Sequence, residues 1–276
     1  MANRVVRDPQ RNRSVTDPAR YDANLTASIH SDSPRSNMMT LHDKTLPAVH
    51  AVILDMDGTL LDTESVYKAC TLQTLADLGW PDQFELIHAM VGLSSAKCDA
   101  VLMNHFGPTF PLEQYHAQFK VKRAARVQAG IALKPGTLEL LDLLASADFP
   151  MAIATSSSRV AAEQHLTIAG IRDRFETVVT VDDVAQAKPD PEVYLRAAAS
   201  LGVDPVHCVA VEDSAAGVLA ASRAGMSTYM VPDMNAPDAQ TAERCVAVCP
   251  DLHAFAALLV QRVAALGRST TDIASP

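Results

Sequence analysis

The sequence predicts an α/β protein with a doubly wound parallel sheet and a second, helical domain inserted after the first strand. Three observations predict this fold. Apolar runs of strand length recur from residue 50 onward, stretches with helical periodicity alternate with them, and a long helix-rich segment (63–129) separates the first run from the second. Strands that alternate with helices are typical of parallel sheets covered on both faces. The chain of 276 residues is long enough for such a core.

Five apolar runs are predicted to form strands, at residues 51–54, 151–154, 177–181, 206–211 and 227–231. They are continuous rather than alternating, as expected of parallel strands buried on both faces. Helices are predicted between them at 136–145, 158–169, 191–201 and 215–224, the last with Gly225 as its C-cap. Ligands of such a sheet bind at the carboxyl ends of its strands, so the functional residues are expected there.

The helix-rich segment is predicted to form a separate helical module. Its apolar residues recur every three or four positions at 63–78, 84–90, 96–105 and 112–129, with linkers at 62–64 and 133–136. Because the module is inserted directly after the first strand, we expect it to lie over the carboxyl end of that strand.

Residues 1–48 differ in composition from the rest of the chain. They are rich in Arg, Asp and Ser and show no periodic apolar pattern, so they are predicted to be disordered. A transit peptide is disfavoured by the acidic residues, and translation from Met38 or Met39 is the other alternative. The last residues, 261–276, are predicted to be a flexible tail.

Composition narrows the classes of partner. The net charge of −9 argues against binding to nucleic acid or to an anionic membrane, both of which need clustered basic residues. No apolar run approaches the length of a membrane span or a signal peptide. The five scattered cysteines form no zinc-site pattern and are expected to be reduced, which predicts a cytoplasmic protein. The chain is expected to be a monomer or a weak homodimer.

The strongest chemical signal is a pair of aspartates, Asp55 and Asp57, directly after the first predicted strand. Two carboxylates at the mouth of a buried strand are unfavourable without a cation, and Mg²⁺ prefers oxygen ligands of this kind. Gly58 permits a sharp turn beside them. The alternative interpretation is a pair of solvated aspartates in a loop.

Three further predicted strands are followed by residues suited to phosphate or metal. Thr155 and Ser156 begin a hydroxyl-rich turn, although N-capping is the favoured role for the serines that follow. Lys188 precedes a helix start, where it could equally be a solvated charge. Glu212 and Asp213 follow the fourth strand, with N-capping by Asp213 or Ser214 as the alternative. Because all of these positions meet at one edge of the sheet, a shared site is favoured over coincidence.

Four segments make the sequence similar to a known family: DMDGTLLDTE (55–64), IATSSS (153–158), KPDPEVY (188–194) and VEDSAAGVLAA (211–221). In this order they resemble the haloacid dehalogenase-like hydrolase superfamily, in the subgroup with a helical cap after the first strand. The resemblance covers about residues 50–250. It implies a Rossmann-like catalytic core (49–62 and 136–260) and a helical cap (63–135).

The resemblance also implies a mechanism, a Mg²⁺-dependent phosphatase acting on a small phosphorylated metabolite. Asp55 would attack phosphorus to form an aspartyl-phosphate, and Asp57 would act as general acid and then base. The other implied roles are phosphoryl binding by Thr155 and Ser156, charge neutralisation by Lys188, and Mg²⁺ binding by Asp55, Asp57, Asp213 and Glu212. Gly92 and Ser94 of the cap are expected to contact the substrate.

Alternatives within and beyond the family remain open. Dehalogenation is disfavoured, because it needs no proton donor and Asp57 is present. A β-phosphoglucomutase-like mutase would carry a cap arginine near residues 91–95, where this chain has serines. A non-catalytic binding or regulatory module would show damage to at least one of the four segments, and none is damaged. The segment 231–235 resembles that of phosphatases for sugar phosphates or nucleoside monophosphates.

Overall fold

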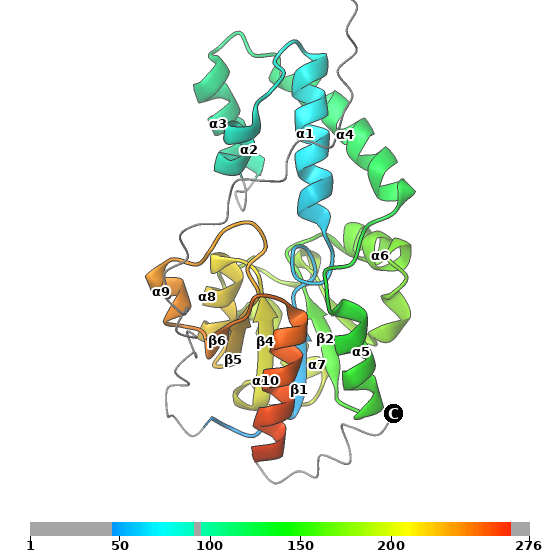
Figure 1. Ribbon diagram of the computed structural model, residues 1–276, viewed down its shortest axis with the longest axis vertical. Helices are drawn as coiled ribbons and strands as arrows, with labels where there is room; N and C mark the ends of the chain where they lie inside the picture. Colours follow the sequence, from blue (N-terminus) through cyan, green and yellow to red (C-terminus); the bar gives the residue numbers. More distant parts are fainter. Residues whose placement is uncertain (1–45, 91–94, 266–276) are drawn as a thin grey trace, which may run out of the picture. The chain divides into compact units, whose positions relative to one another are not determined.

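The computed structural model describes residues 46–90 and 95–265, which belong to one compact unit. Their centre is a six-stranded sheet in the order β3-β2-β1-β4-β5-β6, with every strand parallel to its neighbours (Figure 1). The strands are β1 (Ala51–Leu54), β2 (Met151–Ala154), β3 (Thr177–Val179), β4 (Cys208–Glu212), β5 (Ser227–Met230) and β6 (Ala247–Val248). This confirms the predicted doubly wound parallel sheet.

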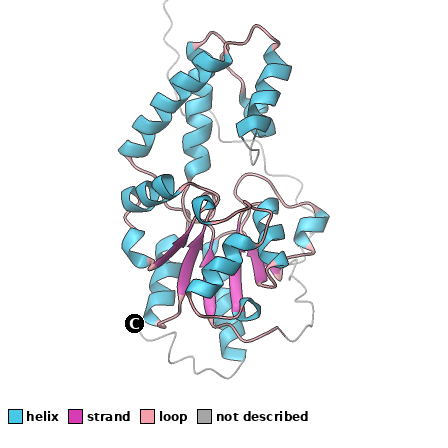
Figure 2. Cartoon of the chain, turned by 180° about the vertical axis from the view of Figure 1, so that it is seen from behind, coloured by secondary structure: helices cyan, strands magenta, loops and turns pink. Residues whose placement is uncertain are grey.

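Helices cover both faces of the sheet, as Figure 2 shows from behind. They are α5 (Thr137–Ser146), α6 (Arg159–Ile168), α7 (Glu192–Ser200), α8 (Ala215–Arg223), α9 (Ala239–Ala242) and α10 (Leu252–Ala265), with short 3-10 turns η1 (Arg172–Arg174), η2 (Val181–Asp183) and η3 (Pro205–His207). Alternate residues of β1 enter opposite layers. Val52 and Leu54 pack with α5, α6 and α10, whereas Ala51 and Ile53 pack with α7 and α8. All four are fully buried, which explains the continuous apolar run.

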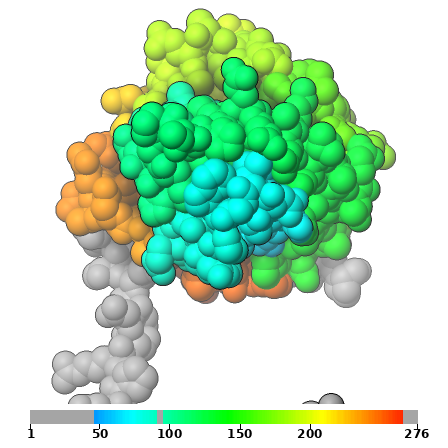
Figure 3. All heavy atoms as spheres, turned by 90° about the horizontal axis from the view of Figure 1, so that it is seen from above, coloured from blue at the N-terminus to red at the C-terminus, as the bar shows by residue number. Residues whose placement is uncertain are grey.

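The described part of residues 63–129 forms four helices that have an apolar core of their own. They are α1 (Thr63–Asp77), α2 (Phe84–Met90), α3 (Ser95–Phe106) and α4 (Leu112–Ala129), and their side chains face the viewer in Figure 3. Leu75, Met90 and Leu102 are buried together. Trp80 packs against Phe106 and belongs to this cluster rather than to a binding surface.

The two linkers of the helical module run side by side. The Asp62 N–H donates to Ala132 O at 2.9 Å, and the Lys134 N–H donates to Leu60 O at 2.8 Å. Asp62 also caps α1 by accepting from the Ser65 N–H at 3.2 Å. The chain therefore enters and leaves the module at neighbouring points beside the loop that follows β1.

The strand β6, the helices α9 and α10 and the three 3-10 turns were not predicted. The strand β6 has only two residues, too few for a recognisable apolar run. The helix α10 extends to Ala265 with Val263 buried, so the ordered core passes residue 260, where the sequence analysis began a flexible tail. Residues 1–45 and 266–276, which hold most of the predicted disordered extension and tail, lie outside the described residues.

The described residues bear on two expectations from composition. The five cysteines, all of them described, form no disulfide. None of the described helices combines the length and the apolar character needed to cross a bilayer.

Candidate active site

The loops at the carboxyl ends of the strands bring the predicted residues together. Asp55 follows β1, Thr155 follows β2, and Glu212 and Asp213 stand at the end of β4. Carboxylate oxygens of Asp55, Glu212 and Asp213 lie within 4.8 Å of one another. Residues far apart in the sequence therefore share one edge of the sheet, as the sequence analysis expected.

Lys188 is the centre of this cluster. Its ammonium donates to Asp55 Oδ1 at 2.6 Å, to Glu212 Oε1 at 2.6 Å and to the Ala154 carbonyl at 2.8 Å. Its side chain is only 5% exposed, so it is not the solvated surface charge that the sequence left open. The two carboxylates raise the pKa of Lys188 above its usual value, although burial acts in the opposite direction. The lysine is therefore charged and held in one place.

Glu212 is fully buried and accepts hydrogen bonds on both oxygens. Oε1 accepts from Lys188 and from the Tyr194 hydroxyl at 2.7 Å, while Oε2 accepts from the Asp213 and Ser214 N–H groups and from the Ser214 hydroxyl. A Cβ at Gly217 would overlap this carboxylate, so the glycine makes room for it. These contacts hold Glu212 against Lys188, a role beyond the metal binding predicted from the sequence.

Asp213 has a different environment. Burial, with the nearby Asp55 and Glu212 carboxylates, raises the pKa of Asp213 well above its usual value, and Lys188 only partly offsets this. No hydrogen bond from the described part of the chain reaches its carboxylate, and Ser214, rather than Asp213, is the N-cap of α8. Gly58, at φ +84°, approaches so closely that a Cβ there would overlap the Asp213 carboxylate.

The cluster carries an excess of negative charge. Three carboxylates meet one ammonium group, and burial and the adjacent carboxylates raise the pKa of Asp55 to about 8 despite Lys188. Buried acids of this kind are stabilised in their charged form by a cation. Hard oxygen donors suit Mg²⁺, so the residues present fit a divalent metal ion of this type.

Asp57 lies beside the cluster. Its carboxylate is contacted by one residue of the turn after β2 and by one residue of α6. The Ser157 hydroxyl donates to Asp57 Oδ2 at 2.6 Å, and His165 Nδ1 lies 3.5 Å from Asp57 Oδ1. Burial would raise the pKa of Asp57, but the adjacent His165 ring and the hydrogen bond from Ser157 outweigh it and lower the pKa. Of the two serines considered as caps, Ser158 caps α6 and Ser157 does not.

The turn after β2 offers hydroxyl groups to the site. Thr155 is buried, and its Oγ1 accepts from the Ser157 N–H at 3.0 Å, which leaves the hydroxyl hydrogen for another acceptor. Ser156 is exposed and lines a cavity of about 910 Å³. Lys188 and Asp213 line the same cavity, as do Glu64 and Lys97 of the helical module.

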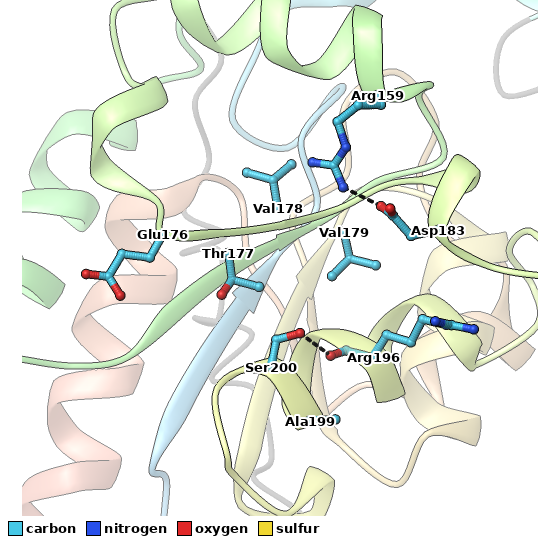
Figure 4. A pocket seen from close by; sticks show the side chains of 9 residues that line it. All are labelled: Arg159, Glu176, Thr177, Val178, Val179, Asp183, Arg196, Ala199 and Ser200. Carbon is cyan, nitrogen blue, oxygen red and sulfur yellow. Dashed lines mark hydrogen bonds and ion pairs between the residues drawn. The ribbon is translucent and has the colours of Figure 1, made fainter.

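A second cavity, of about 580 Å³, lies beside the edge strand β3 (Figure 4). It contains none of the predicted site residues. Its Arg159 pairs with Asp183, and its Arg196 pairs with Glu192, so its cations are already neutralised. The candidate catalytic residues therefore lie at the carboxyl ends of the strands and not in this second cavity.

Three residues of the site were not singled out from the sequence. Ser157, Tyr194 and His165 contact Asp57 or Glu212 from other elements. A serine in a hydroxyl-rich turn and a tyrosine three positions into a helix are common without such roles, so only their contacts reveal them. Gly92 and Ser94, predicted to touch substrate, lie outside the described residues.

Comparison with known proteins shows which family the chain is similar to. The family model described as haloacid dehalogenase-like hydrolase matches residues 49–225. The chain is 34% identical over 206 residues to hexitol phosphatase B of Escherichia coli (strain K12), covering 71% of this chain and 88% of that protein. It is 32% identical over 197 residues to the probable pseudouridine-5'-phosphatase of Drosophila melanogaster, covering 69% and 85%.

A solved structure shares the fold. The crystal structure of a HAD family hydrolase from Deinococcus radiodurans R1, with bound phosphate and sodium, superposes with a TM-score of 0.68 at 26% identity and covers 78% of this chain and 96% of that one. Family model, relatives and fold all lead to one assignment. The chain belongs to the haloacid dehalogenase-like hydrolase family, and its relatives include phosphatases of that family.

Proposed function

We propose that this phosphatase hydrolyses a small phosphate monoester through an aspartyl-phosphate on Asp55, with Mg²⁺ as its cofactor. The observation that carries the proposal is the buried Lys188 bond to Asp55 Oδ1, with Asp57 held by Ser157 at the same strand end. The Asp55 carboxylate is thus fixed beside the Lys188 ammonium group, and the Asp57 carboxyl is held at the same strand end, where it can exchange protons with the leaving group and with water.

In the first step, an Asp55 oxygen attacks phosphorus while the bond from phosphorus to the leaving oxygen breaks. Asp57 acts as the general acid and gives that oxygen the proton that it took up in the preceding cycle. Lys188 orients Asp55 and offsets negative charge, and Thr155 donates its free hydroxyl hydrogen to a phosphoryl oxygen. The alcohol leaves, and Asp55 carries the phosphoryl group.

In the second step, Asp57 takes a proton from a water molecule, whose oxygen attacks phosphorus. The bond between phosphorus and Asp55 breaks, inorganic phosphate leaves, and Asp57 is protonated for the next cycle. The same carboxyl thus acts as acid and then as base. Its contact with Ser157 serves both steps, because the hydroxyl donates to only one of its two oxygens.

The metal would be held by Asp55, Asp213 and the Asp57 carbonyl, with Glu212 contributing beside them. Asp213 supports this assignment, because its carboxylate lies against Asp55 and Glu212 and takes no hydrogen bond from the described residues. Bound there, Mg²⁺ supplies positive charge that lets an anionic nucleophile approach an anionic substrate.

For the substrate we propose a sugar phosphate or a nucleoside monophosphate. The cavity of about 910 Å³ has room for such a molecule and is lined by both charged and uncharged polar groups, among them Glu64, Lys97 and Asn235. The names of the relatives, a hexitol phosphatase and a pseudouridine-5'-phosphatase, support the same two classes. The helical module that carries Glu64 and Lys97 would act as the cap.

Phosphate release tests the substrate class. The full chain, with Mg²⁺, is expected to release phosphate from members of a panel of hexitol phosphates, hexose phosphates, phosphoglycolate and nucleoside monophosphates. Asp55→Asn should abolish turnover. Interconversion of hexose phosphates without net release would instead establish a mutase, and activity retained in Asp55→Asn would exclude Asp55 as nucleophile.

A trapping experiment tests the intermediate. With a substrate that has a good leaving group and a labelled phosphoryl group, Asp57→Asn should accumulate label on the protein, because hydrolysis lacks its base. The label should be released by hydroxylamine, as an acyl phosphate is, and should be absent from Asp55→Asn. Equal labelling of both variants would refute the proposed covalent step.

A further inference from the structure

His165 is a buried polar residue whose position packing alone does not explain. It lies on α6, is 3% exposed, and has Ala162 and Leu166 as its buried neighbours on the helix. Its Nδ1 has no hydrogen-bond partner in the described part of the chain. A buried polar atom without a partner costs about 1–3 kcal/mol, so an apolar residue would serve the core better at this position.

The unpartnered nitrogen faces Asp57. The distance from His165 Nδ1 to Asp57 Oδ1 is 3.5 Å, slightly longer than a hydrogen bond, whereas the Ser157 hydroxyl holds the other oxygen, Oδ2, at 2.6 Å. Each oxygen of the Asp57 carboxyl thus has a protein group beside it: Ser157, in the turn after β2, lies beside Oδ2, and His165, on α6, lies beside Oδ1. Contacts of this length in a ligand-free site commonly shorten when substrate binds.

We infer that His165 is a positioning residue that holds Asp57 Oδ1 through Nδ1 and so fixes the rotation of the carboxyl for proton transfer to the leaving group. The inference rests on the proposed function, in which Asp57 is the general acid. His165 does not touch substrate in this scheme. It restricts the carboxyl from one side while Ser157 restricts it from the other, so the proton is delivered along one direction.

The test uses leaving groups that differ in their need for an acid. An alkyl phosphate needs its oxygen protonated, whereas p-nitrophenyl phosphate leaves without assistance, and kcat/KM reports on this step for both. His165→Leu is expected to lower kcat/KM for the alkyl phosphate about tenfold or more, a part of the 10²–10⁴ that general acids contribute, and to leave p-nitrophenyl phosphate within about twofold.

Two polar variants are matched controls. In His165→Asn the amide nitrogen takes the position of Nδ1, and in His165→Gln it takes the position of Nε2. We expect Asn to retain the ratio of the two kcat/KM values and Gln to lose it, a difference that a packing role would not produce. The pair also keeps the test decisive if His165→Leu fails to fold. Equal losses on both substrates, or the same ratio for Asn and Gln, would overturn the inference.

Asp57→Asn separates this inference from the proposed function. This variant should also lose kcat/KM selectively for the alkyl phosphate, and the loss should be larger than in His165→Leu. If it does and the His165 variants do not, only the role of His165 is wrong. If Asp57→Asn loses equally on both leaving groups, the proposed acid role itself fails.

Discussion

At the scale of single residues, the site is organised by ionisable side chains that burial forces to share partners. Lys188 joins Asp55 and Glu212, and its ammonium also lies 5.0 Å from the centre of the Tyr194 ring. Tyr194 in turn donates to Glu212. A buried charge without a partner is strongly unfavourable, so each of these groups depends on the others.

Removing one hydroxyl tests this dependence. Tyr194→Phe keeps the ring over Lys188 but takes one donor from buried Glu212, and hydrogen bonds to charged groups contribute about 1.5–3 kcal/mol. We expect the free energy of unfolding in urea to fall by about 2 kcal/mol. Tyr115→Phe is the control, because that hydroxyl donates to neutral Thr71 at 3.4 Å. Equal losses in the two variants would contradict the dependence.

The raised pKa of Asp55 predicts how Mg²⁺ stabilises the protein at different pH. Burial, opposed by Lys188 but supported by Glu212, raises the pKa from 3.8 to about 8. Without metal, the folded chain keeps a proton there that the unfolded chain loses above about pH 4, so stability from this group decreases as pH rises toward 8. A cation displaces the proton, and its binding strengthens over the same range.

The increase in Tm on adding Mg²⁺ should therefore be larger at about pH 8 than at about pH 5.5, because proton competition is weaker. Thermal unfolding in EDTA and in Mg²⁺ at the two pH values measures it. Asp55→Asn, which has no such proton to displace, should show a smaller difference. An increase that does not change with pH in the unsubstituted protein would contradict the coupling.

At the scale of elements, α10 connects the C-terminal part of the core to the segment that precedes β1. Arg262 Nη2 donates to Pro47 O at 2.7 Å and to Ser227 Oγ at 3.0 Å, and Val263 is buried in the layer that also contains Phe255. Figure 1 shows α10 lying against the sheet near β1 and β4. The helix thus fixes the segment that leads into β1, from which Asp55 projects.

Truncation measures the contribution of its last turn. A chain that ends at residue 260 loses buried Val263 and the Arg262 hydrogen bonds to Pro47 and Ser227, whereas a chain that ends at residue 265 keeps them. Burying a valine contributes about 1.5–3 kcal/mol and each hydrogen bond about 1 kcal/mol, so the shorter chain should unfold with about 3 kcal/mol less free energy. Equal urea midpoints and slopes for the two chains would show that the last turn is dispensable.

At the scale of the whole molecule, one ion pair joins the return linker of the helical module to the loop after β5. Lys134 Nζ lies 2.6 Å from Asp233 Oδ1, and Asp233 Oδ2 has no partner among the residues described. Asp233 also lines the large cavity, and the Lys134 N–H donates to Leu60 O in the loop after Asp57. These contacts therefore hold the return linker, the loop after Asp57 and the wall of the large cavity together.

A double-mutant cycle tests this connection. Lys134→Met leaves the mostly buried Asp233 without its cation and should lower the free energy of unfolding by about 2 kcal/mol, less than the 3–5 kcal/mol of fully buried pairs. Adding Asp233→Asn removes the unpaired charge and should restore part of the loss. Strict additivity of the two substitutions in urea unfolding would mean that the pair contributes no coupling.

Much of the fold could be predicted because its signals are local. The strand β1 and the helices α2 and α4 have the predicted bounds, since each is a short apolar run or a clear helical period. The strand β3 ends at Val179, two residues before the predicted end, because Val181 begins the 3-10 turn η2. The strand β6 pairs only through Tyr229 and Met230, a non-local contact that no pattern within two residues reveals.

For the site, the sequence by itself determined which residue types stand at the strand ends. Parallel strands deliver their carboxyl ends to one edge, so Asp55, Lys188 and Asp213 were expected near one another at that edge. Only the tertiary structure decided their partners. Asp57 and Ser157 are 100 positions apart, and whether Ser157 or Ser158 reaches Asp57 depends on the direction in which each side chain leaves the turn. The same holds for His165 and Tyr194, because a side chain on a helix contacts its target only after the helix has packed.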